Sequence, residues 1–313
     1  MRAFAHPTQG ATTLTGATRQ RQLPIGEEVF LDHIAHFVPD VEAATRALAH
    51  VGFAPTPISI QVNPDPAGGA PRLTGTGNVT AMFANGYIEV LFKTADTPLV
   101  TEMQTAMARY HGVHLAAFAV ADAAGAQARL ARNGFRVRPL VEMARPVDTG
   151  AEPGTAKFTL ARVAASEMPE GRIQMLTHHT EHLVWQPRWM SHRNGALALS
   201  RVKIVVADLD EAASRYARFT GRTAMRAPFG YTIELDRGYV DLITADDFRQ
   251  LLPEMPIPSL PFMAAYEIKV RSLPALRDLL QHAGVKTWER ENELVATFPK
   301  ELGQGAWLFT DAP

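Results

Sequence analysis

The pattern of apolar and polar residues along the chain repeats four times. Each unit begins with an apolar run typical of a buried strand, then a polar residue able to cap a helix, then apolar residues at helical spacing. In the first unit, Asp40 follows the strand at 30–39, and Gly52 is placed to end the helix in the left-handed conformation. The glycines at the same place in the later units are Gly134, Gly221 and Gly284.

Each predicted helix is followed by about three strand-like runs. In the first unit, runs at 78–83 and 87–93 flank Ala84-Asn85-Gly86. Asn-Gly tolerates the positive φ angles of a tight hairpin turn, so these runs are expected to pair. The order strand, helix, three strands predicts an α+β fold of four βαβββ modules.

The boundaries of the expected parts follow from composition. Residues 1–28 are rich in Thr, Gly, Gln and Arg and lack the apolar stretch of a signal peptide, so we expect a flexible N-terminal arm. A segment with two tryptophans and a proline at 185–195 is typical of a linker. We therefore expect one module pair at 29–190 and a second at 191–313.

Charge and cysteine content exclude several classes of function. The 313 residues carry a formal net charge of −1, which gives no field to hold nucleic acid or an anionic membrane surface. There is no apolar run long enough for a transmembrane helix. With no cysteine, disulfides, thiolate nucleophiles and Cys-zinc sites are excluded, and a cytoplasmic location is expected.

The motifs of the first unit resemble a known superfamily. Asp32-His33 on the first strand, Asp40 before an Ala-rich helix, Gly52-Phe53 after it, and Asn85-Gly86-Tyr87-Ile88-Glu89-Val90-Leu91 together resemble the vicinal oxygen chelate superfamily, closest to its glyoxalase-like domain proteins. The stretch at 178–196 adds to the likeness. The resemblance implies that modules pair into two open barrels, which are cup-shaped mixed sheets with flanking helices. It implies an active site in the first pair and a degenerate, structural second pair.

The resemblance also implies a divalent-metal site in the first pair. Its ligands would be His33, Glu89 and His114, with either Gln174 or His178 as the fourth. Such a set suits Zn, Fe, Mn, Co or Ni. The position of His114 requires a bulge or a one-residue shift, because His33 precedes its helix cap by 7 residues and His114 precedes Asp122 by 8.

The residue types around this site suggest a chemistry. A carboxylate such as Glu89 suits a general base, and Arg145 suits a clamp on a substrate carboxylate. Tyr87 and Tyr110 are candidate donors to substrate oxygens. Each of these residues also has a purely structural interpretation, as a packed or ion-paired side chain. The cluster of His178, His179 and His182 is open to the same two interpretations.

Two classes of function remain from the sequence. One is a metal-dependent lyase or isomerase acting on a small oxygen-rich substrate. The other is a metal-free protein that sequesters a small molecule. Extradiol ring cleavage is disfavoured, because the matching strand of the second pair carries Arg201 and Lys203 where iron ligands would be histidines. Whether two copies of the chain pair as a homodimer stays open.

Overall fold

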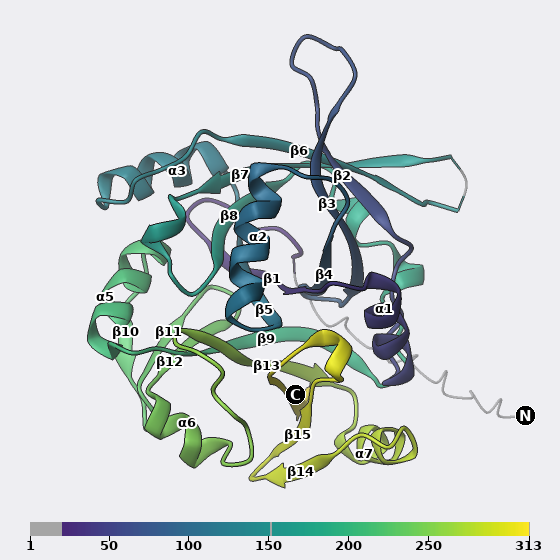
Figure 1. Ribbon diagram of the computed structural model, residues 1–313, viewed down its shortest axis with the longest axis vertical. Coiled ribbons are helices and arrows are strands. Elements are labelled where there is room, and N and C mark those ends of the chain that lie inside the picture. Colours follow the sequence, from purple (N-terminus) through teal and green to yellow (C-terminus); the bar gives the residue numbers. More distant parts are fainter. Residues whose placement is uncertain (1–20, 151, 313) are drawn as a thin grey trace, which may run out of the picture.

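The computed structural model describes residues 21–150 and 152–312, and it contains the four βαβββ modules expected from the sequence (Figure 1). Residues 1–20, most of the expected N-terminal arm, lie outside the described residues. None of the helices in the described ranges has the length and apolar character needed to span a bilayer.

The modules follow one another along the chain. The first contains β1 (Val29–Phe37), α1 (Val41–His50), β2 (Ser59–Asn63), β3 (Arg72–Met82) and β4 (Tyr87–Lys93). The second contains β5 (Gly112–Val120), α3 (Ala123–Arg132), β6 (Val141–Val147), β7 (Gly154–Arg162) and β8 (Arg172–His178). The third contains β9 (Ala196–Val205), α5 (Leu209–Thr220), β10 (Ala224–Arg226), β11 (Tyr231–Glu234) and β12 (Tyr239–Ile243). The fourth contains β13 (Phe262–Val270), α7 (Leu273–His282), β14 (Thr287–Arg290), β15 (Glu293–Thr297) and β16 (Ala306–Asp311).

Three helices lie between modules, and the sequence pattern had not indicated them. They are α2 (Pro98–Arg109), α4 (Glu181–Val184) and α6 (Ala245–Leu251). Short 3-10 turns occupy Ala165–Glu167, Pro187–Trp189 and Lys300–Leu302.

The module helices begin and end as the sequence predicts. The side chain of Asp40 accepts a hydrogen bond from the backbone N–H of Ala43, and the equivalent caps of α3, α5 and α7 also accept from first-turn N–H groups. Just beyond the helices lie the four repeated glycines, all with positive φ, the left-handed region that glycine adopts without steric cost. They are Gly52, Gly134, Gly221 and Gly284.

The first two modules form a closed barrel, whereas the resemblance implied an open cup. Its strand order is β1-β4-β3-β2-β6-β7-β8-β5, and β5 pairs back to β1. The β1–β5 seam runs from Val29 opposite Val120 to Phe37 opposite Gly112, and the opposite seam joins Val62 of β2 to Ala144 of β6. The barrel therefore has an enclosed interior, called the lumen below.

The third and fourth modules form an open sheet in the order β10-β11-β12-β9-β13-β16-β15-β14. One face is filled by a cluster of apolar side chains that includes Phe248 and Leu251 of α6, together with Val205, Ile243 and Leu308 of the sheet. In Figure 1 this half lies below the barrel, with α6 and α7 at its two sides.

The two halves share a continuous core. One cluster of buried side chains joins residues of the first barrel to residues of the second sheet, for example Phe118 of β5 and Phe219 of α5. Between the halves lies a buried ion pair, in which both terminal nitrogens of Arg215 donate to Glu170 at 2.7 and 2.8 Å. The second sheet thus packs directly against the barrel that contains the candidate site.

Candidate functional site

The lumen of the first barrel brings together most of the side chains that the sequence singled out. His33, Glu89, Arg145 and Gln174 all line it, from four different strands. Its remaining wall is polar on the first-module side and mixes arginines with apolar side chains on the second-module side. This wall includes Gln61, Asn78, Tyr87, Leu91, Leu115, Phe158, Leu160, Arg162, Arg172 and Leu176.

His33 is held by a buried carboxylate. Its Nδ1 lies 2.7 Å from Oδ2 of Asp32, and a carboxylate only accepts, so Nδ1 donates this hydrogen bond and Nε2 is the ring nitrogen left for the lumen. The ring also stacks on Tyr87, with 4.4 Å between centroids. The orientation of His33 is therefore fixed from two sides.

Asp32 also binds a second histidine. His178 donates from Nε2 to Oδ1 of Asp32 at 3.1 Å, and its ring packs against Trp185. Burial alone would raise the pKa of Asp32, but the charges and hydrogen bonds of His178 and His33 outweigh it and hold this pKa well below its usual range. Because Nε2 of His178 binds Asp32, it is not directed at Glu89 as a fourth ligand would be.

Glu89 faces His33 across the lumen. Its Oε2 lies 3.6 Å from Nε2 of His33, while its Oε1 accepts hydrogen bonds from Asn78 at 2.5 Å and Gln61 at 3.2 Å. Thr76 donates to the amide oxygen of Gln61 and so fixes which end of that amide points at Glu89. The carboxylate is thus oriented by amide donors, with one oxygen directed at the histidine.

The Tyr87 hydroxyl is kept neutral. Burial is the largest cause, and the negative charges of Asp32 and Glu89 add to it, so the pKa of Tyr87 lies well above its ordinary value. A neutral phenol can donate a hydrogen bond, and donation from Tyr87 to a substrate oxygen stays a prediction.

Gln174 occupies the place in the second module that Glu89 occupies in the first. Glu89 pairs with Ala35 of β1, and Gln174 pairs with Ala117 of β5. The Oε1 of Gln174 accepts a 2.8 Å hydrogen bond from Nε of Arg162, so this oxygen already has a cationic donor.

His114 does not join the lumen. The residue equivalent to His33 is Leu115, since 40 − 33 and 122 − 115 both equal seven and Leu115 lines the lumen. The ring of His114 instead lies 4.0 Å from that of Tyr110, and its Nε2 bonds the Tyr110 carbonyl. Burial lowers the pKa of His114 to about 4.

The residues present do not fit the four-ligand metal centre that the resemblance implies. Leu115, an apolar residue, takes one ligand position, and the amide at Gln174 is engaged by a guanidinium. The described residues contain no group of three or more histidine and acidic side chains arranged to hold a metal ion. His33 and Glu89 are the two strong donors that remain.

The equivalent positions of the second sheet do not form a metal centre either. The carboxylate of Asp241 is bound by Arg201 and Lys203, each at 2.6 Å. Arg201 and Ala265 lie seven residues before the caps of α5 and α7, as His33 does before the cap of α1. The pairings of β12 with β9 and of β16 with β13 identify the other two equivalent positions as Asp241 and Leu308. Arg201 and Lys203 are thus ion-paired to the one carboxylate among these positions.

Three important side chains were missed from the sequence. Asp32 stands next to His33, so the Asp-His pair was visible but its local contact was not considered. Arg172 lies two residues before Gln174 on the same strand, and this spacing places both on one face. Arg162 gives no comparable signal, because only the pairing of β7 with β8 brings it opposite Gln174.

Comparison with known proteins agrees with this architecture. The sequence model of a family described as glyoxalase-like domain matches residues 31–220. A hypothetical protein from Staphylococcus aureus is similar in structure, with a TM-score of 0.61 and 11% identity over 91% of this chain and 99% of that chain. No curated protein sequence matches significantly.

Two further solved structures are similar in fold. A mutant of 4-hydroxymandelate synthase from Streptomyces coelicolor has a TM-score of 0.53 at 13% identity, over 91% of this chain and 92% of that chain. A fusion of a xylose isomerase-like TIM barrel with 4-hydroxyphenylpyruvate dioxygenase has a TM-score of 0.52 at 8% identity, over 90% of this chain and 48% of that chain. Because the family match covers more than half of the sequence, and the paired modules have the fold expected of it, the chain belongs to the glyoxalase-like domain family of the vicinal oxygen chelate fold.

Proposed function

We propose that the lumen of the first barrel carries out proton transfer on a small oxygen-rich substrate, as a lyase or an isomerase. The observation that supports this is the chain of contacts from Asp32 through His33 to Glu89, with 2.7 Å on one side of the imidazole and 3.6 Å on the other. A histidine oriented by a buried carboxylate is a common general base, because the carboxylate stabilises the imidazolium that forms.

The first step breaks a C–H bond next to a substrate carbonyl. The proton passes to Nε2 of His33, and the electron pair moves onto the carbonyl oxygen. The new imidazolium lies between the carboxylates of Asp32 and Glu89, and the guanidinium of Arg145 faces the same lumen as the developing oxyanion. These charges are preorganised, which is the usual source of electrostatic stabilisation in an enzyme site.

The second step decides the reaction class. If the deprotonated carbon carries a hydroxyl, Glu89 takes the hydroxyl proton and gives it to the former carbonyl oxygen. The new carbonyl then forms at the deprotonated carbon, and His33 returns its proton to the former carbonyl carbon, which gives the isomer. Loss of a leaving group from the next carbon gives a lyase reaction, in which the electron pair on oxygen re-forms the carbonyl. In both, every proton is carried by His33 or Glu89.

A divalent metal held by His33 and Glu89 alone, and not by the four-ligand centre rejected above, is the second candidate, favoured by the separation of these two side chains. Nε2 of His33 and Oε2 of Glu89 lie 3.6 Å apart, so both could bind one ion, which would polarise a substrate carbonyl. The sequestration alternative is less suited to a hydrophobic compound, because charged groups line this lumen on both sides.

Proton exchange with solvent tests the proposal. The purified protein would be mixed in D2O with a panel of small 2-oxo and 2-hydroxy acids, and loss of the α-proton signal followed by NMR. We expect exchange with at least one acid, and a decrease of about 100-fold or more in His33→Asn, the usual contribution of a general base. His50→Asn, at an exposed position on α1, is the matched control and is expected to keep the wild-type rate.

The other outcomes favour the alternatives. Exchange that is abolished by a chelator and restored by zinc alone supports the metal candidate. Stoichiometric binding of an acid without exchange supports sequestration. Exchange at the wild-type rate in His33→Asn contradicts the assigned base.

A further inference from the structure

Arg145 is a buried cation without a direct partner. The residue is 5% exposed, and within the described residues its guanidinium makes no hydrogen bond or ion pair, only a cation–π contact with Phe158 at 5.9 Å. Burial lowers its pKa, while the nearby Tyr87 and Glu89 act in the opposite direction. A buried charge is costly unless it is paired, so an anion bound beside Arg145 would remove this cost.

Arg162 and Arg172 form a second cationic group in the same lumen. Arg162 donates only its Nε to Gln174, and Arg172 donates one terminal nitrogen to the Leu99 carbonyl of α2 at 3.3 Å. Burial, together with the neighbouring arginines, lowers the pKa of Arg162 to about 9 and that of Arg172 to about 10. These guanidinium groups keep donors free for a planar anion.

The two cationic groups approach the lumen from different heights. Arg145 pairs with Ala156 of β7, and Arg162 lies 162 − 156 = 6 positions further along that strand, a rise of about 20 Å. Two long arginine side chains directed into one lumen cover much of that length. Apolar side chains lie on the wall between them, including Leu115, Phe158, Leu160 and Leu176.

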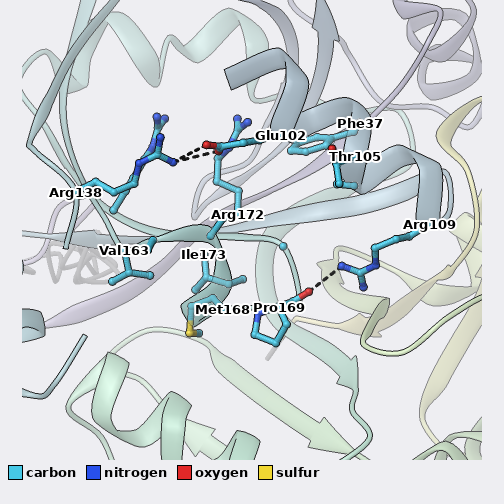
Figure 2. A pocket seen from close by; sticks show the side chains of 15 residues that line it. Phe37, Glu102, Thr105, Arg109, Arg138, Val163, Met168, Pro169, Arg172 and Ile173 are labelled. Carbon is cyan, nitrogen blue, oxygen red and sulfur yellow. Dashed lines mark hydrogen bonds and ion pairs between the residues drawn. The ribbon is translucent and has the colours of Figure 1, made fainter. Parts of the chain in front are cut away.

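A vestibule leads to the Arg162–Arg172 group. It lies between α2 and the segment at 162–173, and it shares Arg162 and Arg172 with the lumen. Figure 2 shows Glu102 of α2 bonded to Arg138, with the Arg172 side chain beside them. Five guanidinium groups but only two carboxylates, Glu89 and Glu102, line the vestibule and lumen together, an excess of positive charge that draws in anions.

We infer that the molecule bound in the lumen is a short dicarboxylate, with one carboxylate on Arg145, the other on Arg162 and Arg172, and its carbon chain against the apolar wall. The inference rests on the proposed function only in assigning the ligand to the same lumen. In this pose the carbon between the two acid groups passes His33 and Glu89, where a proton can be removed.

Binding measurements test the inference without any turnover. Malonate, succinate and glutarate would be compared with propionate and inorganic phosphate by thermal shift and isothermal titration calorimetry. We expect at least one dicarboxylate to bind with 1:1 stoichiometry and at least tenfold more tightly than propionate or phosphate. Propionate or phosphate binding as tightly as every dicarboxylate would overturn the two-ended assignment.

Variants locate the two ends. We expect Arg145→Gln and Arg162→Gln each to weaken dicarboxylate binding at least tenfold and to bring it near the affinity for propionate. Arg132→Gln, at an exposed position on α3, is the matched control and should bind as the wild type does. Arg162→Lys keeps the positive charge but not the planar guanidinium, and it replaces Arg162→Gln if that variant fails to fold. We expect it to bind the dicarboxylate at least threefold more weakly than wild type.

The outcome is separable from that of the proposed function. His33→Asn should keep dicarboxylate binding while losing proton exchange. Wild-type affinity in both Arg145→Gln and Arg162→Gln would overturn the inference, even if proton exchange were observed.

Discussion

The metal positions of the first barrel can be tested by restoring them. Changing Leu115→His together with Gln174→Glu would place two histidines and two carboxylates at the four equivalent positions of the lumen, with His33 and Glu89 as the native pair. Leu115 is buried, and replacing it removes about 2 kcal/mol of apolar stabilisation from the metal-free protein. We expect the double variant to be less stable than wild type until zinc is added.

Zinc should return this stability by mass action. At 100 times its dissociation constant, an ion that binds only the folded chain adds about 2.7 kcal/mol, enough to raise the melting temperature of a chain of this length by about 4 °C. The assay is thermal unfolding with and without zinc, combined with metal content after dialysis. Wild type is the first control, and we expect a much smaller shift from it.

Two further variants decide whether the register is correct. In the double-variant background, Glu89→Gln should remove the zinc-dependent stabilisation, whereas His114→Asn should leave it unchanged, because His114 lies outside the lumen. No zinc-dependent stabilisation in the double variant, or its loss on changing His114, would refute the equivalence of Leu115 and His33.

Two other predictions concern stability. Burial lowers the pKa of both His36 and His114 to about 4, so between pH 7 and 5 the unfolded chain takes up protons that the folded chain does not. The free energy of unfolding should therefore fall by about 2 kcal/mol per histidine over this window. Urea unfolding with the same free energy at pH 7 and pH 5 would contradict this. Glu170→Gln removes the buried carboxylate between the two halves and leaves Arg215 with the half-exposed Glu211 as its remaining ionic partner, so urea unfolding should show a loss of about 2 kcal/mol. A loss below about 0.5 kcal/mol would mean that Glu211 alone satisfies the arginine.

The fold was largely predictable because its signals are local. Apolar periodicity, helix caps such as Asp40 and the glycines after each helix act over a few residues, and all recur four times in the sequence. Closure of the first barrel was not predictable in the same way. It depends on the pairing of β2 with β6, strands far apart in sequence that share one backbone pair, Val62 with Ala144, and two side-chain hydrogen bonds, from Ser59 and Asn63 to carbonyls of β6.

The site was predictable where regular alternation along a strand decides which side chains face the lumen. It was not predictable where a bulge moves a residue to the other face. His33, Glu89, Arg145 and Gln174 meet in the lumen as the strand alternation suggests. His114 was chosen for its residue type, although its distance of eight residues from Asp122 already indicated a change of face. The β1–β5 pairing is irregular between Ala35 and His36, and this shift separates Leu115 from Val113 on the partner strand. The number of residues before the helix cap therefore identifies the lumen position, and the presence of a nearby histidine does not.

The contrast between a closed barrel and an open sheet also has a consequence for self-association. A closed ring of strands offers no unpaired backbone to another chain, so any edge-to-edge growth must begin at the ends of the second sheet, β10 and β14. Both are short, at three and four residues, and both carry charge, at Arg226 in one and at Glu289 and Arg290 in the other. Short charged edges are poor templates for fibrils. Replacing Arg226 by an apolar residue would leave the exposed Met225 on β10 without a charged neighbour. We expect such a variant to aggregate through this edge.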